Sequence, residues 1–217
     1  MSVKAKAIVS LVCNLTVLIA TSVVTVLYFT VGQNELESAY RFLFFTTYSN
    51  YLAALAAGLV AVCDVLILRG KMTTIPRAIT LLKYAGVITL TLTFITVVVL
   101  LIPTYGVARL WGGTGFHMHF AAPVLTFISF MFFEPHCKIR LPETLWGVLP
   151  VVIYGLVYYA QVMIFKAWPD FYTFNRGGKW YISMSVIFIG SYLMCLFVRF
   201  LRNMLTDKKQ RLTFSKK

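Results

Sequence analysis

Two short polar segments, each at the start of a long apolar stretch, contain the residue types that could perform chemistry. The segment FTTYSN, 45–50, carries Thr46, Thr47, Ser49 and Asn50, and GFHMH, 115–119, carries His117 and His119. A threonine hydroxyl is a weak nucleophile unless a neighbouring base takes its proton, and histidine exchanges a proton near neutral pH. The two segments therefore predict a nucleophile–base pair.

The helical period indicates which of these side chains lie together. At about 100° per residue, Thr46, Asn50, Ala53 and Ala57 share one stripe of a helix, and Thr47 and Ser49 lie off it. Small residues let a neighbouring helix approach closely, so the stripe is expected to face protein. On this interpretation Thr46 and Asn50 point into the bundle near its outer end, where His119 is a candidate base for a threonine hydroxyl and Asn50 a candidate either to donate to an oxyanion or to orient the histidine.

The same residues also have a purely structural interpretation. A threonine in a membrane helix often hydrogen-bonds the carbonyl of its own preceding turn, and a histidine near the interface is often only a helix contact. In that case Thr46, Asn50 and His119 hold helices together or bind a head group.

The composition indicates the kind of fold that holds these residues in place. The chain has 217 residues, 59% of them hydrophobic and 12% charged, with mean hydropathy +0.81. We expect an all-α polytopic membrane protein forming one domain of six transmembrane helices, because each apolar run can cross a hydrocarbon core of about 30 Å. The expected spans are 7–31, 42–68, 79–103, 117–134, 144–165 and 180–200, followed by a basic tail at 201–217.

Basic residues flank these spans unequally. Arg41, Arg109, Lys166, Arg176 and Lys179 fall on one side, whereas the other fifteen Lys and Arg residues, Lys83 and Arg202 among them, fall on the side of the N-terminus. The positive-inside rule then predicts cytoplasmic N- and C-termini. The net charge of +13 serves insertion, and no nucleic-acid partner is expected. All four cysteines lie in spans or toward the cytoplasmic side, so no disulfide is expected.

Two outer loops, 101–119 and 165–181, are rich in aromatic residues and glycine. They predict either an aromatic belt at the head groups or a lid over an outward-facing pocket, with Asp170 gating entry. Pro123 and Pro150 interrupt the fourth and fifth spans and are expected to disturb those helices.

Several of these segments together resemble those of a known protein family. The segments F-T-T-Y-S-N, 45–50, and H-F-A-A-P, 119–123, together with Glu134-Pro135, LWGVLPVVIYGLVYY at 145–159 and Trp168-Pro169-Asp170, resemble a bacterial family of six-span proteins. That family is in turn remotely similar to the androgen-induced and androgen-dependent membrane hydrolases, which cleave fatty acid esters of hydroxy fatty acids. Tyr48 departs from the pattern, since relatives usually have Gln there. The Phe-Glu-Pro end of the fourth span is a second departure, because relatives often show an earlier Asp-Trp pair.

The resemblance implies an intramembrane lipid-ester hydrolase of a bacterial cell membrane. It assigns the nucleophile to Thr46, with Thr47 as the alternative, and the base to His119. Asn50, Ser49, His117 and Asp170 become supporting or substrate-binding residues. No cofactor is implied, and membrane lipids with a lipid-ester or fatty-acyl ligand are the expected partners.

Two alternatives remain open. The first is a non-enzymatic protein that binds or transports a small amphiphile, although Asp64, Glu134 and Gln161 look scattered, and Asp64 and Glu134 look like groups at the ends of spans. The second is a haem or metal protein, which His117, His119 and His136 do not support, since the first two diverge on a helix and the third lies at the opposite end. The oligomeric state is not indicated.

Overall fold

The computed structural model describes residues 1–30, 41–108, 112–135 and 137–214. Within these ranges the chain is helical, and six helices are long and apolar enough to span a membrane, as a multi-pass membrane protein requires. They cover Val3–Thr30, Phe45–Leu68, Arg77–Leu101, Thr114–Phe133, Pro142–Ile164 and Trp180–Asp207. The all-α class is therefore confirmed. Val31, Arg109, His136, Lys216 and Lys217, which the expectations above include, lie outside the described residues.

The spans are built from the following elements. The first three are α1 (Val3–Thr30), α3 (Phe45–Leu68) and α4 (Arg77–Thr96), which continues through the π-helical turn η1 (Val97–Leu101) into α5 (Ile102–Tyr105). The fourth joins α7 (Thr114–Phe116), η2 (His117–Ala121), α8 (Ala122–Ile128) and η3 (Ser129–Phe133). The last two are η4 (Pro142–Thr144), α9 (Leu145–Tyr159) and η5 (Ala160–Ile164), then η6 (Arg176–Gly178) and α10 (Trp180–Phe214). Much of the expected tail 201–217 therefore continues the last helix.

The helix of the fourth span is irregular just before Pro123, as the sequence predicts. Pro123 has no N–H to donate to the carbonyl of His119 four residues earlier, and the turn from His117 to Ala121 takes the wider π form. His119, the expected base, thus stands in a π-helical turn, a local geometry frequent at functional sites.

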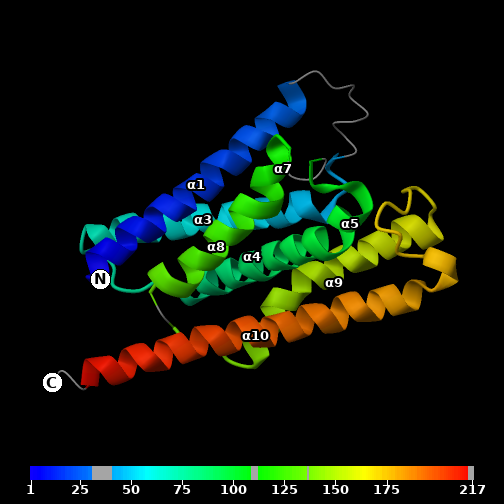
Figure 1. The fold of residues 1–217 in the computed structure, drawn as a ribbon. Helices are drawn as coiled ribbons and strands as arrows, with labels where there is room; N and C mark the ends of the chain where they lie inside the picture. The colour runs from blue at the N-terminus through cyan, green and yellow to red at the C-terminus, as the bar shows by residue number, and fades with distance from the viewer. Residues whose placement is uncertain (31–40, 109–111, 136, 215–217) are drawn as a thin grey trace.

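The helices pack in a regular sequence across the bundle. α1 packs on α3, α3 on α4, α4 on α9, and α9 on α10, which runs the length of the molecule (Figure 1). Ala53 and Ala57 of the predicted small-residue stripe are fully buried, and a Cβ at Gly86 would lie 3.1 Å from the Cα of Ala53. The prediction that this stripe faces protein is confirmed.

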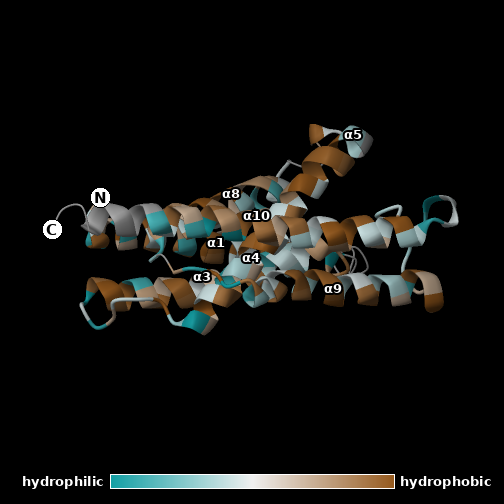
Figure 2. Cartoon of the chain, turned by 90° about the horizontal axis from the view of Figure 1, so that it is seen from below, coloured by the Kyte–Doolittle hydropathy of each residue, from teal (hydrophilic) through white to brown (hydrophobic). Residues whose placement is uncertain are grey.

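The bundle has two distinct ends. We call the end at which α3 begins the outer end, and the end at which α1 begins the inner end, where the C-terminus also lies (Figure 1). Hydrophobic residues run along the helices, and the turns at both ends are more hydrophilic (Figure 2). This distribution is the one that a hydrocarbon core between two aqueous phases requires.

Candidate functional site

The polar cluster at the outer end begins with Thr47 and Ser49, both of which are buried. The Thr47 hydroxyl donates to the carbonyl of Arg41 at 2.7 Å. The Ser49 hydroxyl donates to the carbonyl of Thr46 at 2.9 Å and lies 3.0 Å from the Thr93 hydroxyl on α4. These two residues lie off the predicted stripe but still face protein, because α4 and the segment before α3 cover that side of the helix.

Asn50 joins the two segments that the sequence singled out. Its Nδ2 donates to the carbonyl of Thr46 at 2.8 Å and to the carbonyl of Met118 at 3.1 Å. Its Oδ1 is buried and has no hydrogen-bond partner. A single amide therefore connects the first turn of α3 to η2, next to His119.

The Thr46 side chain lies near the hydroxyl of Tyr172 from the 165–179 loop, and that hydroxyl accepts the backbone N–H of Phe45 at 3.1 Å. Burial raises the pKa of Tyr172 to about 12, so its hydroxyl stays protonated at neutral pH. Thr46 thus lies beside a neutral phenol at the outer end of the bundle.

The two histidines have different environments. His117 Nε2 lies 3.0 Å from the Thr21 hydroxyl and so ties η2 to α1. The Nδ1 of His119 is buried without a hydrogen-bond partner. Within the described residues no hydrogen bond joins Thr46 to His119, so the structure brings their turns together through Asn50 without forming the pair.

Asp170 organises the outer loop that covers Thr46. Its Oδ1 accepts the Tyr158 hydroxyl at 2.9 Å and the N–H of Phe174 at 2.7 Å, and its Oδ2 accepts the N–H of Asn175 at 2.8 Å. Tyr158 packs edge-on against Phe171 with ring centroids 5.0 Å apart. Asp170 therefore fixes the shape of this loop through local contacts.

A large groove opens between α3, α4 and α9. Its volume is about 990 Å³. Its outer end is lined by Phe45, Tyr48, Tyr154 and Trp168, its middle by Leu52, Leu81, Leu82, Ala85, Leu149 and Ile153, and its inner end by Arg77 and Trp146. The side chains of Trp146, Leu149 and Ile153 are exposed on the side of the bundle that faces its surroundings. The groove is therefore apolar along its length and open toward the surroundings of the helices. Neither Thr46 nor His119 lines it.

A second polar site lies at the inner end, and sequence reasoning missed it. Asp64 and Glu134, expected as groups at the ends of spans, are 0% and 2% exposed. Lys83, expected to flank a span on the cytoplasmic side, is 0% exposed and lies 3.5 Å from Glu134. Glu134 does follow the end of η3, whereas Asp64 and Lys83 lie one to two turns inside α3 and α4, and neighbouring helices bury all three side chains.

Side chains from α1 and η3 complete this inner network. Ser10 donates to Asp64 Oδ2 at 2.6 Å, and Ser129 donates to Glu134 Oε1 at 2.9 Å. Asn14 Nδ2 donates to both serine hydroxyls, at 3.2 and 3.0 Å, while Asn14 Oδ1 accepts from Lys83. The i, i+4 spacing of Ser10 and Asn14 in an apolar helix was the available sequence signal.

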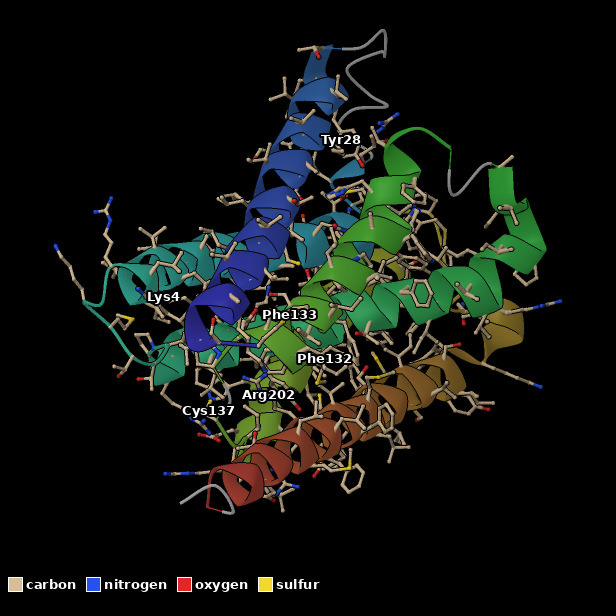
Figure 3. The ribbon with its side chains drawn as sticks, turned by 60° about the vertical axis from the view of Figure 1, so that its left-hand side comes forward. Lys4, Tyr28, Phe132, Phe133, Cys137 and Arg202 are labelled. Carbon is tan, nitrogen blue, oxygen red and sulfur yellow. The ribbon has the colours of Figure 1, made fainter. Side chains whose placement is uncertain are left out.

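Arg202 closes the inner end from α10. It points toward the end of η3 (Figure 3), where it donates to the carbonyls of Phe130 and Pro135 and its guanidinium carbon lies 4.4 Å from the centroid of the Phe130 ring. The last carbonyls of a helix have no partner inside the helix, and a cation there is favourable. Arg202 therefore acts as a cap for the fourth span.

Comparison with known proteins identified no relative. No family model, no curated protein and no solved structure matches the chain. Among the described residues no three His, Cys, Asp or Glu side chains gather as metal ligands. What the protein does must therefore be inferred from the groove, the outer cluster and the inner network.

Proposed function

We propose that the protein binds one acyl chain of a membrane amphiphile in the groove between α3, α4 and α9. The observation that carries this proposal is an apolar groove of about 990 Å³ on the membrane-facing surface of a six-span bundle. Apolar surface at this depth contacts lipid, so a hydrocarbon chain is the occupant that the surroundings supply. Cell-envelope lipids of a bacterium are the proposed source.

The groove is long enough to hold an acyl chain. It follows α9 from Trp146 to Val157, which is about 17 Å at a rise of about 1.5 Å per residue. Its lining also includes Arg77 and Phe45, the first residues of two spans that begin at opposite ends of the bundle. Tyr48, Tyr154 and Trp168 at the outer end are the residue types that favour the head-group region, so the polar group of the ligand belongs there.

Native mass spectrometry of the protein purified in mild detergent tests this proposal. We expect the wild-type protein to retain one lipid. Ile153→Trp, which fills the groove, should lose it, whereas Leu193→Trp, an equally exposed position on α10 outside the groove lining, should keep it. Equal retention by both variants would contradict the proposal.

A second candidate function is ester hydrolysis by Thr46 and His119, for which a specific observation exists. Asn50 hydrogen-bonds the carbonyl of Thr46 and that of Met118, next to His119, whose Nδ1 has no partner. We propose that the Thr46 hydroxyl, which lies near Tyr172, turns toward the histidine when an ester enters from the outer leaflet. Thr46 Oγ1 then attacks the carbonyl carbon, His119 takes the hydroxyl proton and returns it to the leaving alcohol, and water releases the acyl group.

A fluorophosphonate probe distinguishes this candidate from binding alone. Hydrolysis predicts covalent labelling of the wild-type protein that is lost in Thr46→Ala and His119→Ala and kept in Thr47→Ala, because Thr47 hydrogen-bonds the carbonyl of Arg41 instead. Labelling that persists in Thr46→Ala, or that is absent from the wild type, would leave lipid binding as the function.

A further inference from the structure

The inner network contains one carboxyl group without the counterion and the hydrogen-bond donors that a buried carboxylate needs. Asp64 is fully buried, and its Oδ2 accepts one hydrogen bond, from Ser10. Its Oδ1 is buried with no partner at all. A buried carboxylate is stable only when it is paired and its oxygens are hydrogen-bonded, so this environment suits the neutral acid.

Each of the other described carboxylates has a cationic partner or several hydrogen-bond donors. Glu134 has Lys83 and Ser129, Glu143 has Arg77, and Asp207 has Lys138 at 2.7 Å. Asp170 accepts three hydrogen bonds. Among the carboxyl groups that the structure describes, Asp64 alone combines full burial with an oxygen that no donor contacts.

The titratable groups that interact with Asp64 are Cys63 beside it on α3, Lys83 on α4 and Glu134 at the end of the fourth span. Cys13 on α1 and Arg202 on α10 belong to the same network through their interactions with Glu134. The two cations have other partners, since Lys83 contacts Glu134 and Asn14, and Arg202 contacts backbone carbonyls. Neither cation is at ion-pair distance from Asp64, so a negative charge on Asp64 would have no direct counterion.

We infer that Asp64 is a proton-binding site that carries its proton at neutral pH, with Glu134 as the ionised partner of Lys83. Asp64 lies four residues from the inner end of α3, so the compartment that exchanges protons with it is the inner one. The ligand of this site is a proton, and the site does not depend on whether the groove is filled.

Release of the proton would change the network as a whole. The Asp64 O–H bond breaks, its electrons stay on the carboxylate, and the proton passes to water at the inner end. The new anion is then separated from Lys83 only by Ser10 and Asn14, and Asn14 already contacts both Ser10 and Lys83. Lys83 is the cation that can redirect toward Asp64, which would loosen its contact with Glu134 and so couple α1, α3, α4 and the fourth span to the inner pH.

Infrared difference spectroscopy tests the protonation directly, because a protonated carboxyl absorbs apart from ionised carboxylates. The chain has seven Asp and Glu residues, so few bands compete. At neutral pH we expect one carboxylic-acid band in the wild-type protein, lost in Asp64→Asn and kept in Glu134→Gln. A wild-type spectrum without the band, or a band lost in Glu134→Gln and kept in Asp64→Asn, would overturn the inference.

A second variant keeps the test decisive if a substitution at Asp64 or Glu134 impairs folding. Ser10→Ala removes the hydrogen bond to Asp64 Oδ2 and leaves the carboxyl in place. Its carboxylic-acid band should move to higher frequency than in the wild type, because the carboxyl loses its hydrogen-bond donor. Ser22→Ala is the matched control, since Ser22 bonds only the Leu18 carbonyl on the exposed face of the same helix. A band that is unmoved in Ser10→Ala would also overturn the inference.

Discussion

At the scale of single residues, the pair of Lys83 and Glu134 places two charges where water does not reach. Breaking such a pair leaves one charge buried without a partner, which costs about 3–5 kcal/mol. Lys83→Met should therefore lower the free energy of unfolding by about that amount, measured by denaturant unfolding in detergent micelles. The double variant Lys83→Met, Glu134→Gln should recover much of the loss, because no charge is then left unpaired.

The exposed pair of Lys138 and Asp207 provides the comparison. Its side chains are about half exposed, and their nitrogen and oxygen are 2.7 Å apart. Solvent screening limits such a pair to about 0–1 kcal/mol, so Asp207→Asn should change stability little. A loss in Asp207→Asn as large as that in Lys83→Met would contradict the claim that burial is what makes the inner pair important for stability.

Asp170 gives a prediction for the outer loop. Hydrogen bonds to a charged acceptor contribute about 1.5–3 kcal/mol each, and Asp170 accepts three. Asp170→Ala should speed amide hydrogen exchange across 170–175, and Asp170→Asn should have a smaller effect because one acceptor oxygen remains. Exchange that is unchanged in Asp170→Ala would show that the aromatic contacts of Tyr158 alone hold the loop.

Sequence reasoning predicted some residues of the site and missed others for one physical reason. The helical period places Asn50, Ala53 and Ala57 on a protein-facing stripe, and the structure agrees. The period says nothing about which neighbour covers the other faces, so the burial of Thr47, Asp64 and Lys83 could not be read from it. The same limit applies to Thr46, whose neighbour Tyr172 comes from a loop 126 residues along the chain.

At the scale of elements, close approach of α4, α9 and α10 depends on Gly147. A Cβ there would lie 2.8 Å from the Cys195 sulfur and 2.9 Å from Ile88 Cγ1. Gly147→Ala should therefore destabilise the protein by about 1–3 kcal/mol through overpacking, measured as a lower midpoint of thermal unfolding.

Gly190 on α10 is the matched control, because a Cβ there would meet nothing within 4 Å. Gly190→Ala should be neutral or stabilise by up to about 1 kcal/mol, since alanine is the better helix former. Destabilisation by Gly190→Ala similar to that by Gly147→Ala would show that the packing of α9 on α10 does not set the effect.

The helices themselves were the most predictable elements. Runs of apolar residues set five of the six spans to within about four residues at each end, since hydrocarbon thickness fixes their length. The π-helical turns were not predicted, although Pro123 indicates a disturbance near η2. The extension of α10 to Phe214 was also missed, because an amphipathic basic helix has no hydropathy signal of its own.

At the scale of the whole molecule, an even number of spans places both termini on one side (Figure 1). The excess of basic residues predicts that this side is the cytoplasm, and the burial of Lys83 and Arg202 leaves that excess in place. A fluorescent protein that matures only in the cytoplasm should be bright when fused to the C-terminus. A phosphatase that is active only outside should be active when fused after Asn175. The reverse result would invert the orientation.

An acyl chain held in the groove between α3, α4 and α9 would bring a photoactivatable group on that chain within reach of the residues that line the groove. The most direct test is to incubate the protein in lipid nanodiscs with a photoactivatable long-chain fatty acid and to map the labelled residues by mass spectrometry. We predict that labels concentrate on groove residues such as Leu52, Leu82 and Leu149. Labels spread evenly over exposed apolar residues, with Leu193 and Phe197 of α10 marked as strongly as the groove, would contradict the account.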